Sequence, residues 1–241
     1  MTITEIDIIS GISSLISIII FTLLGLIIIS KYFKYRSRDL LLFGITVIGL
    51  AEPFYGPSFS FLTALITGEG LSVEPYMLLS LVGNPITLVC FVAVVANLVY
   101  KEKGRIIVYL FIIYAIIIEI LLFYFLFTEP SLVGVIKGIT DAEYGIFART
   151  YVISALVVLI IGGTLFARES IKSNKPDLIL KGKLLLPAFY IFVISAIIDA
   201  AVPLNEITLP LNRILLILSG ILFYLGFVLP DWFKNLFIKE T

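Results

Sequence analysis

The chain has 241 residues, of which 60% are hydrophobic and 14% are charged, and its mean hydropathy is +1.14. Soluble domains carry about 45–50% apolar and about 25% charged residues, so this composition predicts an all-α integral membrane protein. The formal net charge is zero, which gives no basis for nucleic-acid binding.

The composition also limits the kinds of metal and catalytic site that the chain can form. Histidine is absent, which removes the commonest metal ligand and the commonest general base. The single cysteine, Cys90, lies in an apolar run, so no disulfide can form within the chain and no thiol cluster can hold a metal. We therefore expect no metal and exclude zinc-dependent membrane hydrolases.

The first residues, MTITEID, are acidic and lack the basic segment of a secretory signal. We expect the first apolar run to be a retained helix. Seven apolar runs approach the roughly 20 residues that a helix needs to cross hydrocarbon. They cover residues 7–31, 39–66, 76–100, 105–128, 145–168, 184–203 and 210–229. The prediction is a single seven-transmembrane helix bundle over residues 1–241, with the second span kinked or broken at Pro53, Gly56 and Pro57.

Basic residues predict the orientation of the bundle. Most lysines and arginines follow spans one, three and five or lie in the tail. They are Lys31, Lys34, Arg36, Arg38, Lys101, Lys103, Arg105, Arg168, Lys172, Lys175, Lys181, Lys183, Lys234 and Lys239. The opposite side has only Lys137, Arg149 and Arg213. We expect a multi-pass plasma-membrane protein with its N-terminus outside and its C-terminus in the cytoplasm.

The last two spans each contain one ionisable residue near the short turn 204–209 that joins them. Asp199 and Arg213 lie at similar depth, and a charge in lipid is costly, so we predict that they pair inside the bundle. No lysine occurs between Lys183 and Lys234. A retinal Schiff base needs a lysine in the last helix, so covalent retinal is excluded and no cofactor is expected.

The other polar residues within the spans are also expected in the outer half of the membrane. The inner half has almost none, and Asn97 is the exception. Two interpretations remain open. The charges form internal ion pairs that fix helix register, or they line an outward-facing pocket that binds a small polar ligand or senses protons. The candidate pocket residues are Glu52, Tyr55, Asn84, Glu119, Arg149, Tyr151, Asp199 and Arg213.

The tail after Pro230 predicts a short amphipathic helix over 231–239, with Trp232, Phe233, Leu236 and Phe237 on one face. This helix is either a membrane-surface anchor or a contact for a cytoplasmic partner. Small residues such as Gly162, Gly163 and Gly220 indicate close helix packing.

Seven spans with the N-terminus outside resemble the topology of rhodopsins and G-protein-coupled receptors. However, no Asp-Arg-Tyr follows span three and no Asn-Pro-x-x-Tyr lies in span seven. Residues 223–237, FYLGFVLPDWFKNLF, resemble the end of the seven-helix sensory regions found ahead of archaeal histidine kinases. No kinase follows here, so the resemblance implies a separate cytoplasmic signalling protein or a stand-alone relative. The abundance of isoleucine also suggests an archaeal or other prokaryotic source.

The favoured hypothesis is a non-enzymatic sensor or receptor-like protein whose outer charges change partners when a ligand or proton arrives. A small-solute or proton-coupled transporter is the main alternative, and it would need a polar path to the inner face. A membrane-embedded enzyme with Glu52 or Asp199 as acid or base, and a lysine-less opsin relative with a non-covalent chromophore, are further alternatives. Expected partners are the lipid bilayer and the small ligand, and a homodimer stays open.

Overall fold

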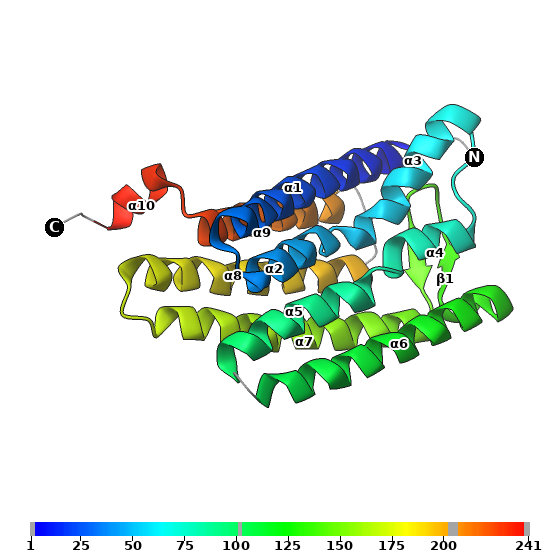
Figure 1. Cartoon of the computed structure of the whole chain (residues 1–241). Helices are drawn as coiled ribbons and strands as arrows, with labels where there is room; N and C mark the ends of the chain where they lie inside the picture. The colour runs from blue at the N-terminus through cyan, green and yellow to red at the C-terminus, as the bar shows by residue number, and fades with distance from the viewer. Residues whose placement is uncertain (1–2, 101–102, 202–206, 239–241) are drawn as a thin grey trace.

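The computed structural model describes residues 3–100, 103–201 and 207–238, and it is a bundle of antiparallel helices with one small hairpin (Figure 1). The α-helices are α1 (Glu5–Tyr35), α2 (Arg38–Gly49), α3 (Tyr55–Thr67), α4 (Val73–Leu81), α5 (Asn84–Val99), α6 (Gly104–Thr128), α7 (Ile146–Ile171), α8 (Pro176–Ala201), α9 (Thr208–Val228) and α10 (Asp231–Phe237). The short elements are the 3-10 helices η1 (Glu52–Phe54) and η3 (Pro130–Leu132) and the strands β1 (Gly134–Ile136) and β2 (Ala142–Tyr144).

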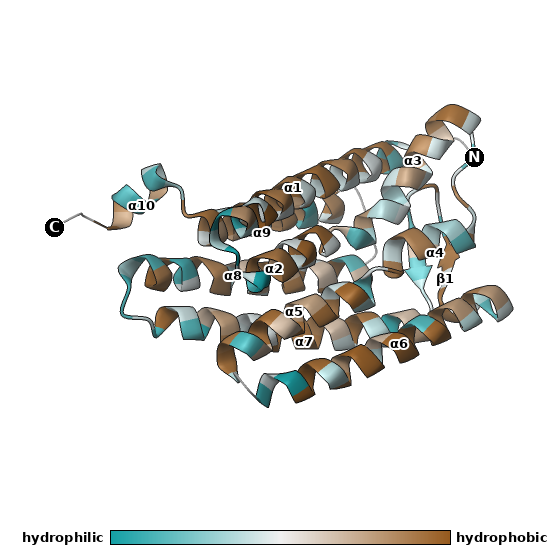
Figure 2. Ribbon diagram, viewed as in Figure 1, coloured by the Kyte–Doolittle hydropathy of each residue, from teal (hydrophilic) through white to brown (hydrophobic). Residues whose placement is uncertain are grey.

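Seven helical segments of the described chain are long and apolar enough to cross a membrane, which agrees with the predicted spans. The second segment combines α2, η1 and α3, and the third combines α4 and α5. Figure 2 shows hydrophobic residues along the helices and hydrophilic ones gathered at the turns. The predicted interruption near Pro53 is confirmed, because α2 ends at Gly49 and α3 begins at Tyr55.

The main difference from the predicted spans lies between α7 and α8. The sequence predicted a long connection over 169–183, but α7 continues to Ile171 and α8 begins at Pro176. Proline suits the first helical turn because its missing N–H would have no helical partner there. The apolar residues 178–180 belong to this helix, and the sixth candidate span accordingly covers Pro176–Ala200. The predicted turn 204–209 and the end of the span 184–203 fall partly outside the described residues.

The two ends of the bundle differ: one has the β-hairpin and is called the hairpin end, and the other has most of the lysines and arginines and is called the basic end. The hairpin end has β1 and β2, which pair antiparallel with Val135 opposite Glu143, and the start of α1. The basic end has the turns at 36–37 and 172–175 and helix α10 (Figure 1). Helix α10 covers 231–237 of the predicted 231–239, and residue 239 lies outside the described residues.

Aromatic side chains fill the middle of the bundle, where α8 packs between α7 and α9 and α1 packs on α2 and α9. The rings of Phe189 and Phe223 meet edge to face at 4.9 Å between centroids, and Phe192 packs beside them. A side chain on Gly163 would collide with the Phe189 ring, which confirms close packing at this small residue. A layer of packed apolar side chains therefore lies between the two ends.

Helices α1 and α2 also approach each other through glycines. A Cβ added at Gly25 would lie 2.7 Å from the carbonyl oxygen of Gly44, and one added at Gly44 would lie 2.8 Å from that of Gly25. No real side chain tolerates such contacts, so the two backbones meet directly at this crossing.

Lysines at the basic end hold the C-terminus of α9. Lys181 Nζ donates to the carbonyl oxygen of Phe227 at 3.0 Å, and Lys31 Nζ lies 3.4 Å from the same oxygen. Lys234 of α10 forms an ion pair with Asp177 of α8 at 3.0 Å. These contacts satisfy helix-end carbonyls and attach α10 to the start of α8.

Candidate functional site

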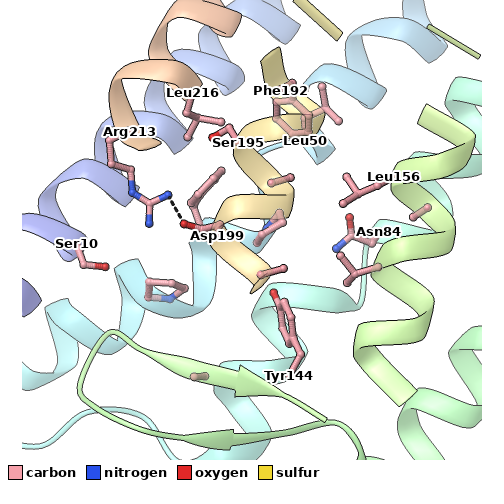
Figure 3. Close-up of a pocket in the computed structure, with 18 of the residues that line it drawn as sticks. Ser10, Leu50, Asn84, Tyr144, Leu156, Phe192, Ser195, Asp199, Arg213 and Leu216 are labelled. Atoms are coloured by element: carbon pink, nitrogen blue, oxygen red, sulfur yellow. Dashed lines mark ion pairs between the residues drawn. The ribbon is translucent and has the colours of Figure 1, made fainter. Parts of the chain in front are cut away.

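A cavity of about 190 Å³ lies at the hairpin end, enclosed by α1, η1, α5, α7, α8 and α9 beneath the β-hairpin. Its inner wall is apolar and includes Leu50, Phe91 and Phe192. Its mouth is polar and includes Asp7, Asp141 and Asp199, of which Figure 3 labels Asp199. Such a combination of apolar walls with a few converging polar groups is typical of small-molecule sites.

The predicted pair of the last two spans is confirmed. Arg213 Nη1 lies 3.2 Å from Asp199 Oδ1, as the dashed line in Figure 3 marks. Asn212 Nδ2 donates to the same carboxylate oxygen at 3.1 Å, and Ser195 Oγ donates to Asn212 Oδ1 at 2.9 Å. The Arg213 guanidinium also lies 5.1 Å from the centre of the Phe54 ring. Residues of α8, α9 and η1 thus compensate one buried cation.

The guanidinium of Arg213 is nevertheless incompletely satisfied. Arg213 is only 6% exposed, and its Nε and Nη1 atoms have no hydrogen-bond acceptor of good geometry in the described part of the chain. The Tyr151 hydroxyl also has no partner there, but the acids that act on it are Glu52 and Glu119, which do not line the cavity. Buried donors without partners are rare and costly, so the spare donors of Arg213 are available to a molecule in the cavity.

The β-hairpin is fastened over the mouth by helix α1. Asp7 Oδ2 accepts from Thr4, completing the N-terminal capping box of α1, while its Oδ1 accepts from the Thr140 hydroxyl at 3.1 Å. The Tyr76 hydroxyl donates to the Thr140 carbonyl oxygen at 3.0 Å, and the Ser60 hydroxyl donates to the Ile139 carbonyl. The loop that carries Thr140 is therefore anchored to α1, α3 and α4.

Two titratable residues of this hairpin face the cavity. Burial raises the pKa of Tyr144 well above its usual range, and the negative charge of Asp199 adds to the shift. Figure 3 shows Tyr144 pointing from the strand toward the cavity. Asp141 keeps an exposed surface, but the protein atoms around its carboxyl group exclude part of its solvent and raise its pKa; the charge of Asp199 acts in the same direction.

Behind the cavity wall, Glu52 joins the two interrupted spans. Its carboxylate accepts a hydrogen bond from the backbone N–H of Gly83, at the junction of α4 and α5. Its other oxygen, Oε2, has no partner among the described residues. Glu119 of α6 lies near enough to interact with Glu52 electrostatically, and its Oε2 is also buried without a partner there.

The structure brings only part of the predicted pocket together. Asn84, Tyr151, Asp199 and Arg213 line the cavity. Glu52 lies behind its wall, and Glu119 lies beyond Glu52. Tyr55 stacks on Phe59 instead, with ring centroids 6.2 Å apart.

Arg149 is a correction to the predicted set of buried charges. Its Nη2 lies 3.3 Å from Glu143 on the outer face of the hairpin, and both side chains are about half exposed. The prediction failed because it compared only depth along the helices. The position of Arg149 around the helix axis and its strand partner were not visible from the sequence.

Sequence reasoning also missed four residues that line the cavity, namely Asp7, Thr140, Asp141 and Tyr144, and the buried Asn212 that donates to Asp199. The T-x-x-D pattern at Thr4–Asp7 marks a helix start and could have indicated Asp7. The loop residues have no periodic pattern, so no signal placed them over the cavity. Within the described ranges, no three acidic or cysteine side chains are grouped to hold a metal.

A comparison of the chain with protein-family models, with curated proteins and with solved structures found no match. The assignment of function therefore rests on the fold and the cavity.

Proposed function

We propose that this chain is a non-enzymatic, seven-helix membrane sensor, with its hairpin end outside the cell and its basic end in the cytoplasm. The observation that carries the proposal is the cavity at the hairpin end, where the buried Arg213 retains unpaired donors beside Asp199. A ligand that takes up those donors changes the balance of this ion pair, which joins α8 to α9. The excess of lysine and arginine at the basic end supports this orientation.

The contacts at the basic end supply a route for output. Helices α8 and α9 each run from the cavity to the lysine contacts that hold α9 and α10. A shift between α8 and α9 at the Asp199–Arg213 pair therefore reaches Lys181 and Phe227 at the other end. The earlier resemblance to archaeal sensory regions fits a cytoplasmic signalling partner that reads α10.

The packed layer below the cavity favours a sensor over a transporter. Phe189, Phe192 and Phe223 fill the path toward the basic end, whereas transport needs that path to open. A flux assay in proteoliposomes addresses this point. Ligand-dependent passage of solute or protons would favour transport, and a tight membrane would favour sensing.

Hydrogen exchange of the protein in nanodiscs tests the proposed coupling. We expect Asp199→Asn to accelerate amide exchange in the basic-end segments 172–178 and 229–237, because it disturbs the α8–α9 pair. Glu69→Gln, an equal change of charge on an exposed loop at the hairpin end, is the matched control. Arg213→Lys, which keeps the positive charge, provides a second variant if Asp199→Asn folds poorly. Exchange that changes only near the cavity would contradict the coupling.

A further inference from the structure

The charges that line the cavity are unbalanced. Three carboxyl groups, from Asp7, Asp141 and Asp199, share the cavity with one guanidinium, from Arg213. A fourth acid at the mouth, Glu143, is compensated outside by Lys137 and Arg149. The cavity therefore has an excess of negative charge that favours a positively charged guest.

Asp141 is the acid with the least compensation. Asp199 pairs with Arg213, and Asp7 accepts hydrogen bonds from Thr4 and Thr140. Asp141 forms no ion pair with any described residue. Burial and, after it, the charge of Asp199 raise the pKa of Asp141, and a positive charge beside its carboxyl group would act in the opposite direction, because it favours the carboxylate form.

Two independent observations indicate a ligand rather than a merely acidic surface. Arg213 lines the cavity and is more than nine-tenths buried, and its Nε donor has no partner among the described residues. The deeper wall, with Leu88, Leu156 and Phe192, offers no polar partner to a charged group. An occupant must therefore combine a polar end at the mouth with an apolar body in the interior.

We propose that the cavity binds a small organic cation, a protonated amine on an apolar body, with the ammonium group between Asp141 and Asp199. The apolar body contacts Leu156 and Phe192, and the spare Nε donor of Arg213 serves an uncharged oxygen of the ligand where it has one. This assignment rests on the proposed function, since it takes the cavity to be the sensing site, and it adds the chemical class of the ligand.

Four probes that share a phenylethyl group test the charge preference: 2-phenylethylamine, 2-phenylethanol, 3-phenylpropanoate and phenylalanine. They present a cation, a neutral hydroxyl, an anion and a zwitterion to the same cavity. Binding is measured by calorimetry on the full chain in nanodiscs, with protein-free nanodiscs subtracted to remove partition into lipid. We expect the amine to bind at least about tenfold more tightly than the alcohol, and the anion to bind most weakly.

The Asp141→Asn variant locates the ammonium group. We expect about a tenfold loss of affinity for 2-phenylethylamine and no change for 2-phenylethanol, because only the cation interacts with the lost charge. Glu69→Gln serves again as the control, and it should leave both affinities unchanged. Asp141 lies at the mouth of the cavity and not in the packed core, so the variant is expected to fold.

Each remaining result has a definite meaning. Tighter binding of phenylalanine or phenylpropanoate than of the amine would make Arg213 the anchor and overturn the cation assignment. Equal binding of amine and alcohol, or no binding of any probe, would also overturn it. Amine binding that leaves exchange at 172–178 and 229–237 unchanged would preserve the ligand assignment and contradict the proposed sensor function.

Discussion

The two ends of the bundle treat their charged groups in opposite ways. At the basic end, Lys31 and Lys181 are engaged with the carbonyl oxygens that end α9, and Lys234 is paired with Asp177. At the hairpin end, Arg213 is buried with donors left over and Asp141 has no ion-pair partner among the described residues. Completed contacts stabilise one arrangement, whereas incomplete ones leave room for a ligand, so we expect binding at the hairpin end and rigidity at the basic end.

The largest test of this comparison is Asp199→Asn. The variant leaves the buried guanidinium of Arg213 without its carboxylate, which typically costs about 3–5 kcal/mol. We expect a loss of about that size in the free energy of unfolding, measured in mixed micelles. Arg213→Met should cost less, because Asp199 is 29% exposed at its side chain and keeps its bond from Asn212. Equal losses for the two variants would contradict the view that Arg213 is the more deeply desolvated partner.

The glycine crossing of α1 and α2 tests packing rather than charge. Gly25→Ala forces a methyl group against the Gly44 carbonyl oxygen, and we expect a loss of about 1–3 kcal/mol in the same unfolding measurement. Gly220→Ala is the matched control within α9, where the nearest atom to an added Cβ is Ile20 Cγ2 at 3.3 Å. That change should stay within about 1 kcal/mol of the wild type, because helix propensity favours alanine. A harmless Gly25→Ala would rule out direct backbone contact at the crossing.

Lys181→Met examines the basic end. The substitution keeps an apolar stem but removes the hydrogen bond to Phe227, and we expect a loss of about 1 kcal/mol. It should also accelerate amide exchange in α10, because the end of α9 is less firmly held. Lys172→Met is the control, since Lys172 is exposed and, within the described ranges, forms an ion pair only with Glu169 of the preceding turn. A comparable effect of both variants would mean that any lysine at this end stabilises the fold equally.

The smallest expected effect is a pH dependence at Asp141. An acid with a raised pKa in the folded state stabilises the fold fully below its unfolded pKa, and this stabilisation is lost as pH rises through the folded pKa. The titratable and charged groups around Asp141 are Asp7, Tyr76, Glu143, Tyr144, Asp199 and Arg213, and Lys137 pairs with Glu143.

The melting temperature of the wild type should therefore fall relative to that of Asp141→Asn as the pH rises above the ordinary aspartate value of 3.8. Saturating 2-phenylethylamine should reduce this fall, because the cation stabilises the carboxylate. A difference in melting temperature that is constant across pH would show that Asp141 titrates normally.

Hydropathy predicted the seven spans because a membrane-crossing helix must be apolar over most of its length. The cost of charge in lipid likewise predicted the Asp199–Arg213 pair, since the short turn between their spans makes them neighbours. The interruption near Pro53 follows from the loss of a helical hydrogen bond at proline.

The remainder of the site depends on contacts that sequence spacing does not reveal. Asp7 meets Thr140 across 133 positions of the chain. Glu143, the ion-pair partner of Arg149, lies on β2. This strand has only three residues, too few for an alternating pattern to be recognised. The sequence therefore predicted Asp199 at the cavity mouth, but neither Asp7 nor the hairpin residues around it.

The bond between Glu52 and Gly83 has a mechanical consequence. It makes the interruptions of two neighbouring spans a single hinge, so α3 and α4 are expected to rock together as one flap and not to bend independently. Pro53 and Asn84, at the root of that flap, are also part of the cavity wall. We therefore expect a substitution of Glu52, which does not line the cavity itself, to change the shape of the cavity through Pro53 and Asn84.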